Sequence, residues 1–196
     1  MRPVLVVMVK EPRPGLVKTR LGRDIGMSAA AWWYRHQTAQ LLRQIRDPRW
    51  NLVLAVSPDR EGLKSRVWPP DVARIAQGGG ALGPRMQRLL AGFGPGAVCV
   101  IGSDIPGITR TVIADAFRAL GQVSLVFGPA PDGGYWLIGA KGPVARAPGF
   151  LENVRWSSPH ALHDSIASAH GVRIAQISSL ADVDEATDLD RDKKAQ

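Results

Sequence analysis

The sequence has a single cysteine, Cys99, among 196 residues. A disulfide framework needs cysteine pairs, so we expect none here, as is usual for proteins of a reducing compartment. Long hydrophobic runs are also missing. The apolar run at residues 4–9 ends at Lys10 and is too short for a signal-peptide core or a membrane span. We therefore expect a soluble, cytoplasmic protein.

Acidic residues are fewer than basic ones, 17 against 25, which gives a formal net charge of +8. A positive excess favours anionic partners. The sequence shows no run of basic residues, no aromatic-rich RNA-binding signature and no zinc-ligand spacing, which argues against nucleic acid as the partner. His160 and His163 are three residues apart without an evident third ligand, so we expect no zinc site. Small phosphorylated ligands fit the scattered arginines better.

Short apolar runs alternate with helical patterns along the whole chain. Strands are expected at residues 4–9, 51–56, 72–76, 97–101, 124–127 and 172–177. Helices are expected at residues 29–46, capped by Ser28, at 109–120, capped by Thr109, and at 157–170, with shorter ones between. This alternation predicts a single three-layer α/β/α domain over residues 1–190 with a mostly parallel mixed sheet, and residues 191–196 as a frayed tail.

The strand at residues 97–101 organises the chain, and it ends at Gly102-Ser103-Asp104-Ile105-Pro106. Its continuous apolar run predicts burial on both faces, near the centre of the sheet. Ligands of open α/β sheets bind at the carboxyl ends of the strands, so Asp104 is a candidate ligand for a divalent cation that carries phosphates. Asp and Pro also form ordinary turns, and a simple turn is the alternative.

The loop at residues 10–21 follows the first strand and carries Lys18 and Arg20 after two prolines and Gly15. Proline and glycine exclude regular structure up to Gly15, and the two cations then lie where a nucleotide's phosphates would bind. The loop has neither of the two common glycine-rich nucleotide-binding spacings, and a solvated basic loop is the alternative. We expect Lys18 to contribute little to the core, so that its loss weakens nucleotide binding but barely changes stability.

Two further loops contain glycine-rich segments. The segment Gln77 to Met86 leads from a strand into a helix, where glycines allow close approach of a base or ribose and Arg85 turns toward phosphate. A flexible surface turn is the alternative. Asp132-Gly133-Gly134 predicts a tight turn into a strand, with Asp132 facing the same cleft as Asp104 or serving only as a turn residue.

Five segments, residues 10–21, 77–86, 102–106, 128–139 and 182–189, resemble in order the pattern of the DUF2064 family of glycosyltransferase-A-like (GT-A-like) proteins. The specific motifs are Pro-Gly-x-x-Lys-Thr-Arg-Leu and Asp-Gly-Gly-Tyr-x-Leu-Ile-Gly. The family is similar to molybdenum-cofactor guanylyltransferases, phospholactate guanylyltransferases and cytidylyltransferases. The resemblance implies the fold of nucleotide-diphospho-sugar transferases.

The resemblance also implies roles for individual residues. Asp104 and Asp184 would hold one Mg²⁺ or Mn²⁺, and Asp104, Lys18 and Asp132 would be catalytic. Contacts to the nucleotide and to the acceptor would come from Lys10, Gly15, Lys18, Arg20, Gln77, Gly79, Gly80, Arg85, Ser103, Asp132, Gly133 and Gly134.

The activity implied is a metal-dependent glycosyl transfer from a nucleotide-diphospho-sugar to a small-molecule acceptor. A nucleotidyltransferase that releases pyrophosphate is an alternative. It is favoured because the metal site has one Asp, at residue 104, instead of the Asp-x-Asp pair that is common among glycosyltransferases. Ala81 and Pro84 stand where the family pattern has acids, so a nucleotide-binding protein without turnover is another alternative. The sequence does not predict the base, the sugar, the acceptor or the oligomeric state.

Overall fold

A computed structural model describes residues 1–189 of the chain, and a seven-stranded sheet lies at its centre. The sheet has the order β3-β2-β1-β4-β6-β5-β7, with strands β1 (Val4–Lys10), β2 (Asn51–Ser57), β3 (Ala73–Ala76), β4 (Ala97–Ile101), β5 (Leu125–Pro129), β6 (Tyr135–Lys141) and β7 (Ile174–Gln176). Strand β6 pairs antiparallel with β4 and β5, and all the other pairs are parallel. The expected mostly parallel mixed sheet is confirmed, and β4 is its middle strand.

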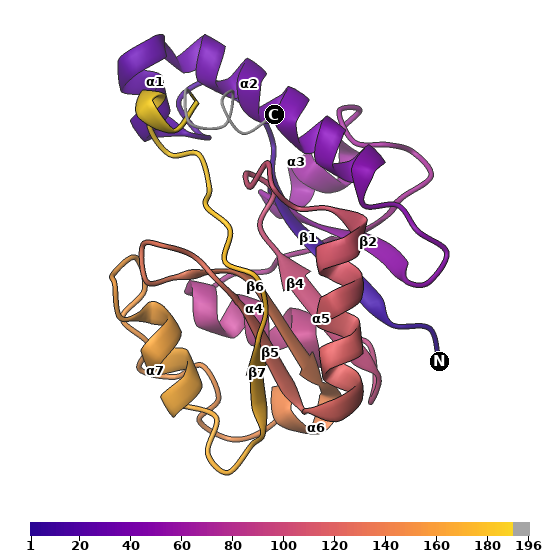
Figure 1. Ribbon diagram of the computed structural model, residues 1–196. Helices are drawn as coiled ribbons and strands as arrows, with labels where there is room; N and C mark the ends of the chain where they lie inside the picture. The colour runs from indigo at the N-terminus through magenta and orange to yellow at the C-terminus, as the bar shows by residue number, and fades with distance from the viewer. Residues whose placement is uncertain (190–196) are drawn as a thin grey trace.

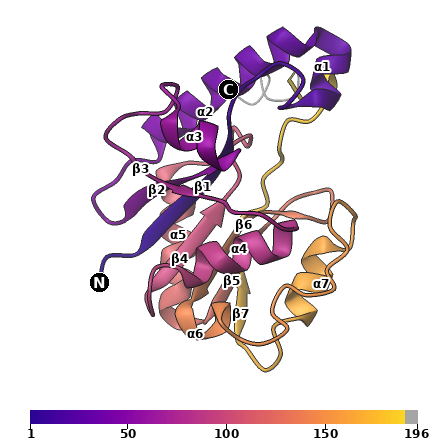
Figure 2. The same ribbon diagram turned by 180° about the vertical axis from the view of Figure 1, so that it is seen from behind.

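Helices cover both faces of the sheet, as Figures 1 and 2 show. The helices are α1 (Thr19–Ile25), α2 (Met27–Gln44), α3 (Asp59–Lys64), α4 (Leu82–Ala91), α5 (Arg110–Gln122), α6 (Gly142–Ala145) and α7 (Ala161–Ala167). Side chains alternate along β1, so Leu5 and Val7 pack into a core with α2 and α5, while Val4 and Val6 pack into a second core with α4 and α6. The three-layer α/β/α architecture follows from this alternation.

Several element boundaries differ from the expectation. Helix α1 begins inside the expected loop at residues 10–21, and Gly26 separates it from α2, which starts at Met27 before Ser28. Ser28 is therefore not a cap, whereas Thr109 caps α5 as predicted by accepting the Val112 N–H at 3.4 Å. Helix α7 starts later than expected because Ser158 accepts the His160 N–H and closes a turn.

The chain after β7 leaves the sheet as an extended segment and reaches α1, where residues 186–189 are helical (Figure 1, yellow). The Leu180 N–H donates to the Pro129 carbonyl at 3.1 Å, and the Val183 N–H donates to the Asp104 carbonyl at 3.2 Å. This segment therefore passes the carboxyl end of β4. The expected frayed tail at residues 191–196 lies outside the described residues. No helix in the described part of the chain has the length and apolarity needed to cross a membrane.

Candidate active site

A cavity of about 590 Å³ lies at the carboxyl ends of β1 and β4. Four of the residues that line it are basic, namely Lys10, Lys18, Arg20 and Arg85, and two are acidic, namely Asp104 and Asp184. Sheets of this kind place their ligands at this edge. The charges make the cavity suitable for an anion that is bound together with a cation.

Lys18 connects the basic and acidic parts of this cavity. It precedes α1, and its side chain is only 7% exposed, with Nζ 2.5 Å from Asp104 Oδ2 and 2.7 Å from Asp184 Oδ1. Burial of the ammonium disfavours its charge, but the two carboxylates outweigh burial and raise the pKa of Lys18. The expectation that Lys18 contributes little to the folded structure is therefore wrong, and so is the alternative of a solvated basic loop at this residue. Lys18 holds together two segments that are far apart in sequence.

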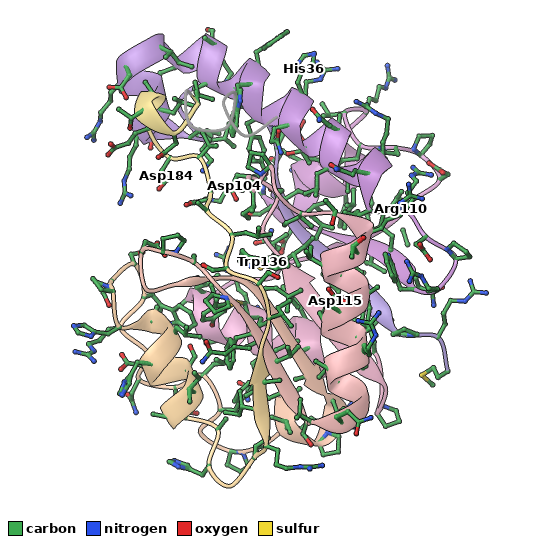
Figure 3. All side chains as sticks on the ribbon, viewed as in Figure 1. His36, Asp104, Arg110, Asp115, Trp136 and Asp184 are labelled. Carbon is green, nitrogen blue, oxygen red and sulfur yellow. The ribbon has the colours of Figure 1, made fainter. Side chains whose placement is uncertain are left out.

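Asp184 lies next to Asp104 because the extended segment after β7 brings it there, as Figure 3 shows. It also accepts a hydrogen bond from Arg20 Nη1 at 3.1 Å. Burial opposes its ionisation, yet the hydrogen bond and charge of Lys18, followed by Arg20, lower the pKa of Asp184. The structure thus brings together Asp104, Asp184, Lys18 and Arg20 as the resemblance implies.

Asp182 is a third carboxylate that the sequence analysis missed. One ligand oxygen each of Asp104, Asp182 and Asp184 lies within 4.8 Å of the others. Burial, followed by the charge of Asp184, raises the pKa of Asp182. Asp182 is two residues from Asp184 in an extended segment, and this spacing in Asp-Val-Asp was the signal that could have identified it.

Tyr34, also missed, fixes the base of the cavity from α2. Its hydroxyl accepts the Lys10 N–H at 2.9 Å and hydrogen-bonds Ser103 Oγ at 2.8 Å, so it joins the ends of β1 and β4. Burial raises the pKa of the Tyr34 phenol. Gln77 links β1 and β2, because its Nε2 donates to the Val9 carbonyl on β1 at 3.1 Å and to the Ala55 carbonyl on β2 at 2.8 Å. Both side chains make the cavity wall rigid.

The glycine-rich segment before α4 is held by arginines. Arg88, which the sequence analysis did not select, donates to the Gly79 carbonyl at 2.8 Å, and Arg85 Nε donates to the Gly80 carbonyl at 2.8 Å. Gly80 has φ +96° and lines the cavity, whereas Gly79 does not. The segment is therefore an ordered wall of the cavity.

A second cavity of about 220 Å³ adjoins the first, and Leu82, Gly102 and Asp104 line both. Asp132 and Gly134 from the turn between β5 and β6 line this second cavity, as do aromatic residues that include Trp136, labelled in Figure 3. The Gly134 N–H donates to Asp132 Oδ1 at 2.9 Å, which orders the turn. Asp132 thus faces the same cleft as Asp104.

Three of the selected residues line neither cavity, namely Gly15, Gly79 and Gly133. Gly133 has φ +83°, and a Cβ there would lie 2.2 Å from the Pro159 carbonyl oxygen. Its position therefore reflects close packing of the turn against residues 157–160. Every other residue selected from the sequence lines at least one cavity, namely Lys10, Lys18, Arg20, Gln77, Gly80, Arg85, Ser103, Asp104, Asp132, Gly134 and Asp184.

Over residues 1–189, the sheet order and the reversed strand β6 define a mixed α/β sheet with two adjoining cavities at one edge, which is the fold of the nucleotide-diphospho-sugar transferase to which the chain is similar. The chain belongs to the family described as uncharacterised protein conserved in bacteria (DUF2064), whose model matches residues 40–158, more than half of the chain. A search of curated proteins finds no match.

Solved structures agree on the fold. A protein of Desulfovibrio desulfuricans G20, described as a nucleotide-diphospho-sugar transferase, is 28% identical with a TM-score of 0.81, over 94% of this chain and 83% of that one. Rv0371c of Mycobacterium tuberculosis H37Rv, in a complex with manganese, is 15% identical with a TM-score of 0.59, over 99% and 98%. The 2-C-methyl-D-erythritol 4-phosphate cytidylyltransferase of Thermus thermophilus is 15% identical with a TM-score of 0.54, over 100% and 98%.

Proposed function

We propose that this protein is a metal-dependent glycosyltransferase. It binds a nucleotide-diphospho-sugar in the first cavity and transfers the sugar to a small acceptor in the second. The observation that carries the proposal is that Asp104 lines both cavities, so that a donor and an acceptor can meet beside one carboxylate. The transferase description of the Desulfovibrio protein supports this class of enzyme.

The basic residues of the first cavity suit the diphosphate of the donor. Glycosyl transfer breaks the bond between the sugar carbon and the diphosphate, and the electron pair leaves with the diphosphate. Lys18 and Arg20 neutralise this growing negative charge, which is the main electrostatic demand of the reaction. Arg20 is 67% exposed and turns to a phosphate without loss of packing, whereas Lys18 must exchange one of its carboxylate partners for it.

The carboxylates suit a divalent cation. Oxygens bound to one Mg²⁺ at about 2.1 Å lie up to roughly 4.2 Å apart, so ligand oxygens within 4.8 Å of each other need only a small movement. Asp104, Asp182 and Asp184 would hold the ion, which supplies charge neutralisation on the diphosphate when bound. In this proposal Asp132, which lines the second cavity, accepts the proton of the acceptor hydroxyl as the new bond to the sugar carbon forms.

The test combines donor binding and turnover. The protein is incubated with UDP-, GDP-, dTDP- and ADP-sugars in Mg²⁺ or Mn²⁺, and affinity is measured by calorimetry and products by mass spectrometry. Asp104→Asn should weaken donor binding by at least about tenfold, while the matched control Asp115→Asn, on the outer side of α5, should not (Figure 3). Equal donor affinity in the two variants would contradict the proposal.

Nucleotidyl transfer is the second candidate. One acid follows β4 at Asp104, with Gly102 and Ser103 before it in place of an Asp-x-Asp pair, and the Thermus neighbour is a cytidylyltransferase by name. Pyrophosphate release from CTP or GTP, with no sugar transfer, would favour it. Nucleotide binding without any product would favour a binding protein, the alternative that Ala81 and Pro84 suggest.

A further inference from the structure

The two adjoining cavities differ in charge. The described residues that line the second cavity include the carboxylates of Asp104, Asp132 and Asp182, but no lysine, arginine or histidine. The first cavity, by contrast, has four basic residues. A phosphate group beside Asp132 would meet a carboxylate with no cation in the lining of this cavity to pair with, because Lys18, the cation beside Asp104, is held by Asp104 and Asp184 and lines the first cavity. Like charges in close contact are unfavourable.

Aromatic side chains form the opposite wall of the second cavity. Tyr135 and Trp156 meet edge to face, with ring centroids 6.3 Å apart, and Trp136 is fixed by donating its Nε1 to the Ser178 carbonyl at 3.0 Å. Trp156 also packs close to Gly83 of α4, where a Cβ would lie 3.1 Å from its ring. The apolar surface of this wall comes chiefly from Tyr135 and Trp156, which are half-buried, because Trp136 is only 4% exposed.

The carboxylates of the lining accept hydrogen bonds, and the hydroxyl of Ser158 already donates to the Arg155 carbonyl at 2.6 Å. An ionised carboxylate has acceptor capacity and no proton to donate, so Asp132 favours a ligand that carries O–H groups. The volume of about 220 Å³ is below the range of about 300 to 1,000 Å³ that is usual for drug-sized ligands. The occupant is therefore small, or it is one end of a larger molecule.

We propose that the acceptor is a neutral, hydroxyl-bearing compound such as a sugar or polyol, whose C–H face lies on the aromatic wall and whose hydroxyls donate to Asp132. This inference rests on the proposed function, since it assigns the second cavity to the acceptor. The inference excludes phosphorylated compounds as acceptors. A hydroxyl-bearing acceptor is consistent with glycosyl transfer, which forms a bond between the sugar carbon and a hydroxyl oxygen.

The test reads binding at the second cavity itself. The full chain is labelled with ¹⁵N, and the indole N–H signal of Trp156 is assigned with Trp156→Phe. Glycerol, D-ribose and D-glucose are titrated without a divalent cation, beside glycerol 3-phosphate, ribose 5-phosphate, glucose 6-phosphate and glucosamine, so that the charge of the lining itself decides which compounds bind. Neutral compounds should shift the Trp156 signal at concentrations at least about tenfold lower than their phosphates.

Asp132→Asn keeps the shape of the turn and removes one charge. It should therefore reduce the difference between the concentrations at which neutral and phosphorylated compounds shift the Trp156 signal. The control Asp115→Asn, on α5, should leave this difference in concentration unchanged. The proposal is overturned if phosphates shift the signal as readily as neutral compounds. It is also overturned if glucosamine binds more than about tenfold tighter than glucose, or if no neutral compound shifts the signal. Donor binding is measured by calorimetry on the same samples after MgCl₂ is added, and its absence counts against the proposed function alone.

Discussion

Replacing Lys18 by alanine removes the ammonium that lies between Asp104 and Asp184, and two properties should change. Unit charges about 4 Å apart attract by about 4 kcal/mol at an effective dielectric constant of about 20. The desolvation of Lys18 offsets much of this, and breaking a buried ion pair costs about 3–5 kcal/mol. Because the side chains of Asp104 and Asp184 are 28% and 39% exposed, water partly replaces the lost cation. We expect a loss of about 2 kcal/mol in unfolding free energy, or about 4–8 °C in Tm.

The assay compares Lys18→Ala with Lys64→Ala, a lysine on the exposed side of α3. Urea unfolding gives stability, and calorimetry gives the affinity for a nucleotide diphosphate, which should fall by about 1.5–3 kcal/mol in Lys18→Ala alone. Mg²⁺ should restore more stability to Lys18→Ala than to wild type, because it relieves the repulsion that the lysine had balanced. Equal stability and affinity in the two variants would refute the reasoning.

Three further predictions concern the frame of the site. Tyr34→Phe should cost about 1–2 kcal/mol in urea unfolding, because two buried polar groups lose their partner; an unchanged midpoint would show that water replaces the hydroxyl. The Arg155 hydrogen bonds hold the pKa of Asp164 below its usual range. This contribution is present at pH 7 and is lost only as the pH falls below about 4. The difference in unfolding free energy between wild type and Asp164→Asn should therefore stay constant from pH 7 to about pH 4 and shrink below it, and a difference that stays constant below about pH 4 counts against the pair. Gly133→Ala should destabilise the protein by about 1–3 kcal/mol more than Gly171→Ala. Both glycines have positive φ, but the added Cβ meets a carbonyl oxygen at 2.2 Å only at the first, and equal losses would exclude the contact as the cause.

The sheet could be predicted from the sequence because its strands are short apolar runs separated by turn residues. The position of β4 at the centre followed from its continuous apolar residues. The short helices α1 and α6 could not be predicted, since seven and four residues are too few to show a helical period. They form because tertiary contacts stabilise them, and α1 lies against α2 with its Leu21 side chain buried.

The candidate site was predictable where a motif marked it. Lys18, Asp104 and Asp132 each follow or precede a strand in a recognisable pattern. The role of Tyr34 was not predictable, because a tyrosine inside an amphipathic helix looks like any core residue until the helix is placed against β1 and β4. Asp182 was missed for a different reason, since the family pattern marked only Asp184 of the Asp-Val-Asp sequence, although residues two apart in an extended segment lie on the same side of it.

The reversal of β6 has a consequence for how this fold diversifies. It brings the turn between β5 and β6 to the edge where the parallel strands end. All but one of the residues that line the first cavity come from residues 8–104, whereas most of those that line the second come from residues 105–182. The two halves of the gene thus encode two compartments that share one carboxylate. Changes in residues 105–182 can therefore alter the second compartment, but the first keeps its chemistry only if Asp184 is retained, because Asp184 lies in the second half and pairs with Lys18. Chimaeras joined just after Asp104 must keep this aspartate to exchange one compartment alone.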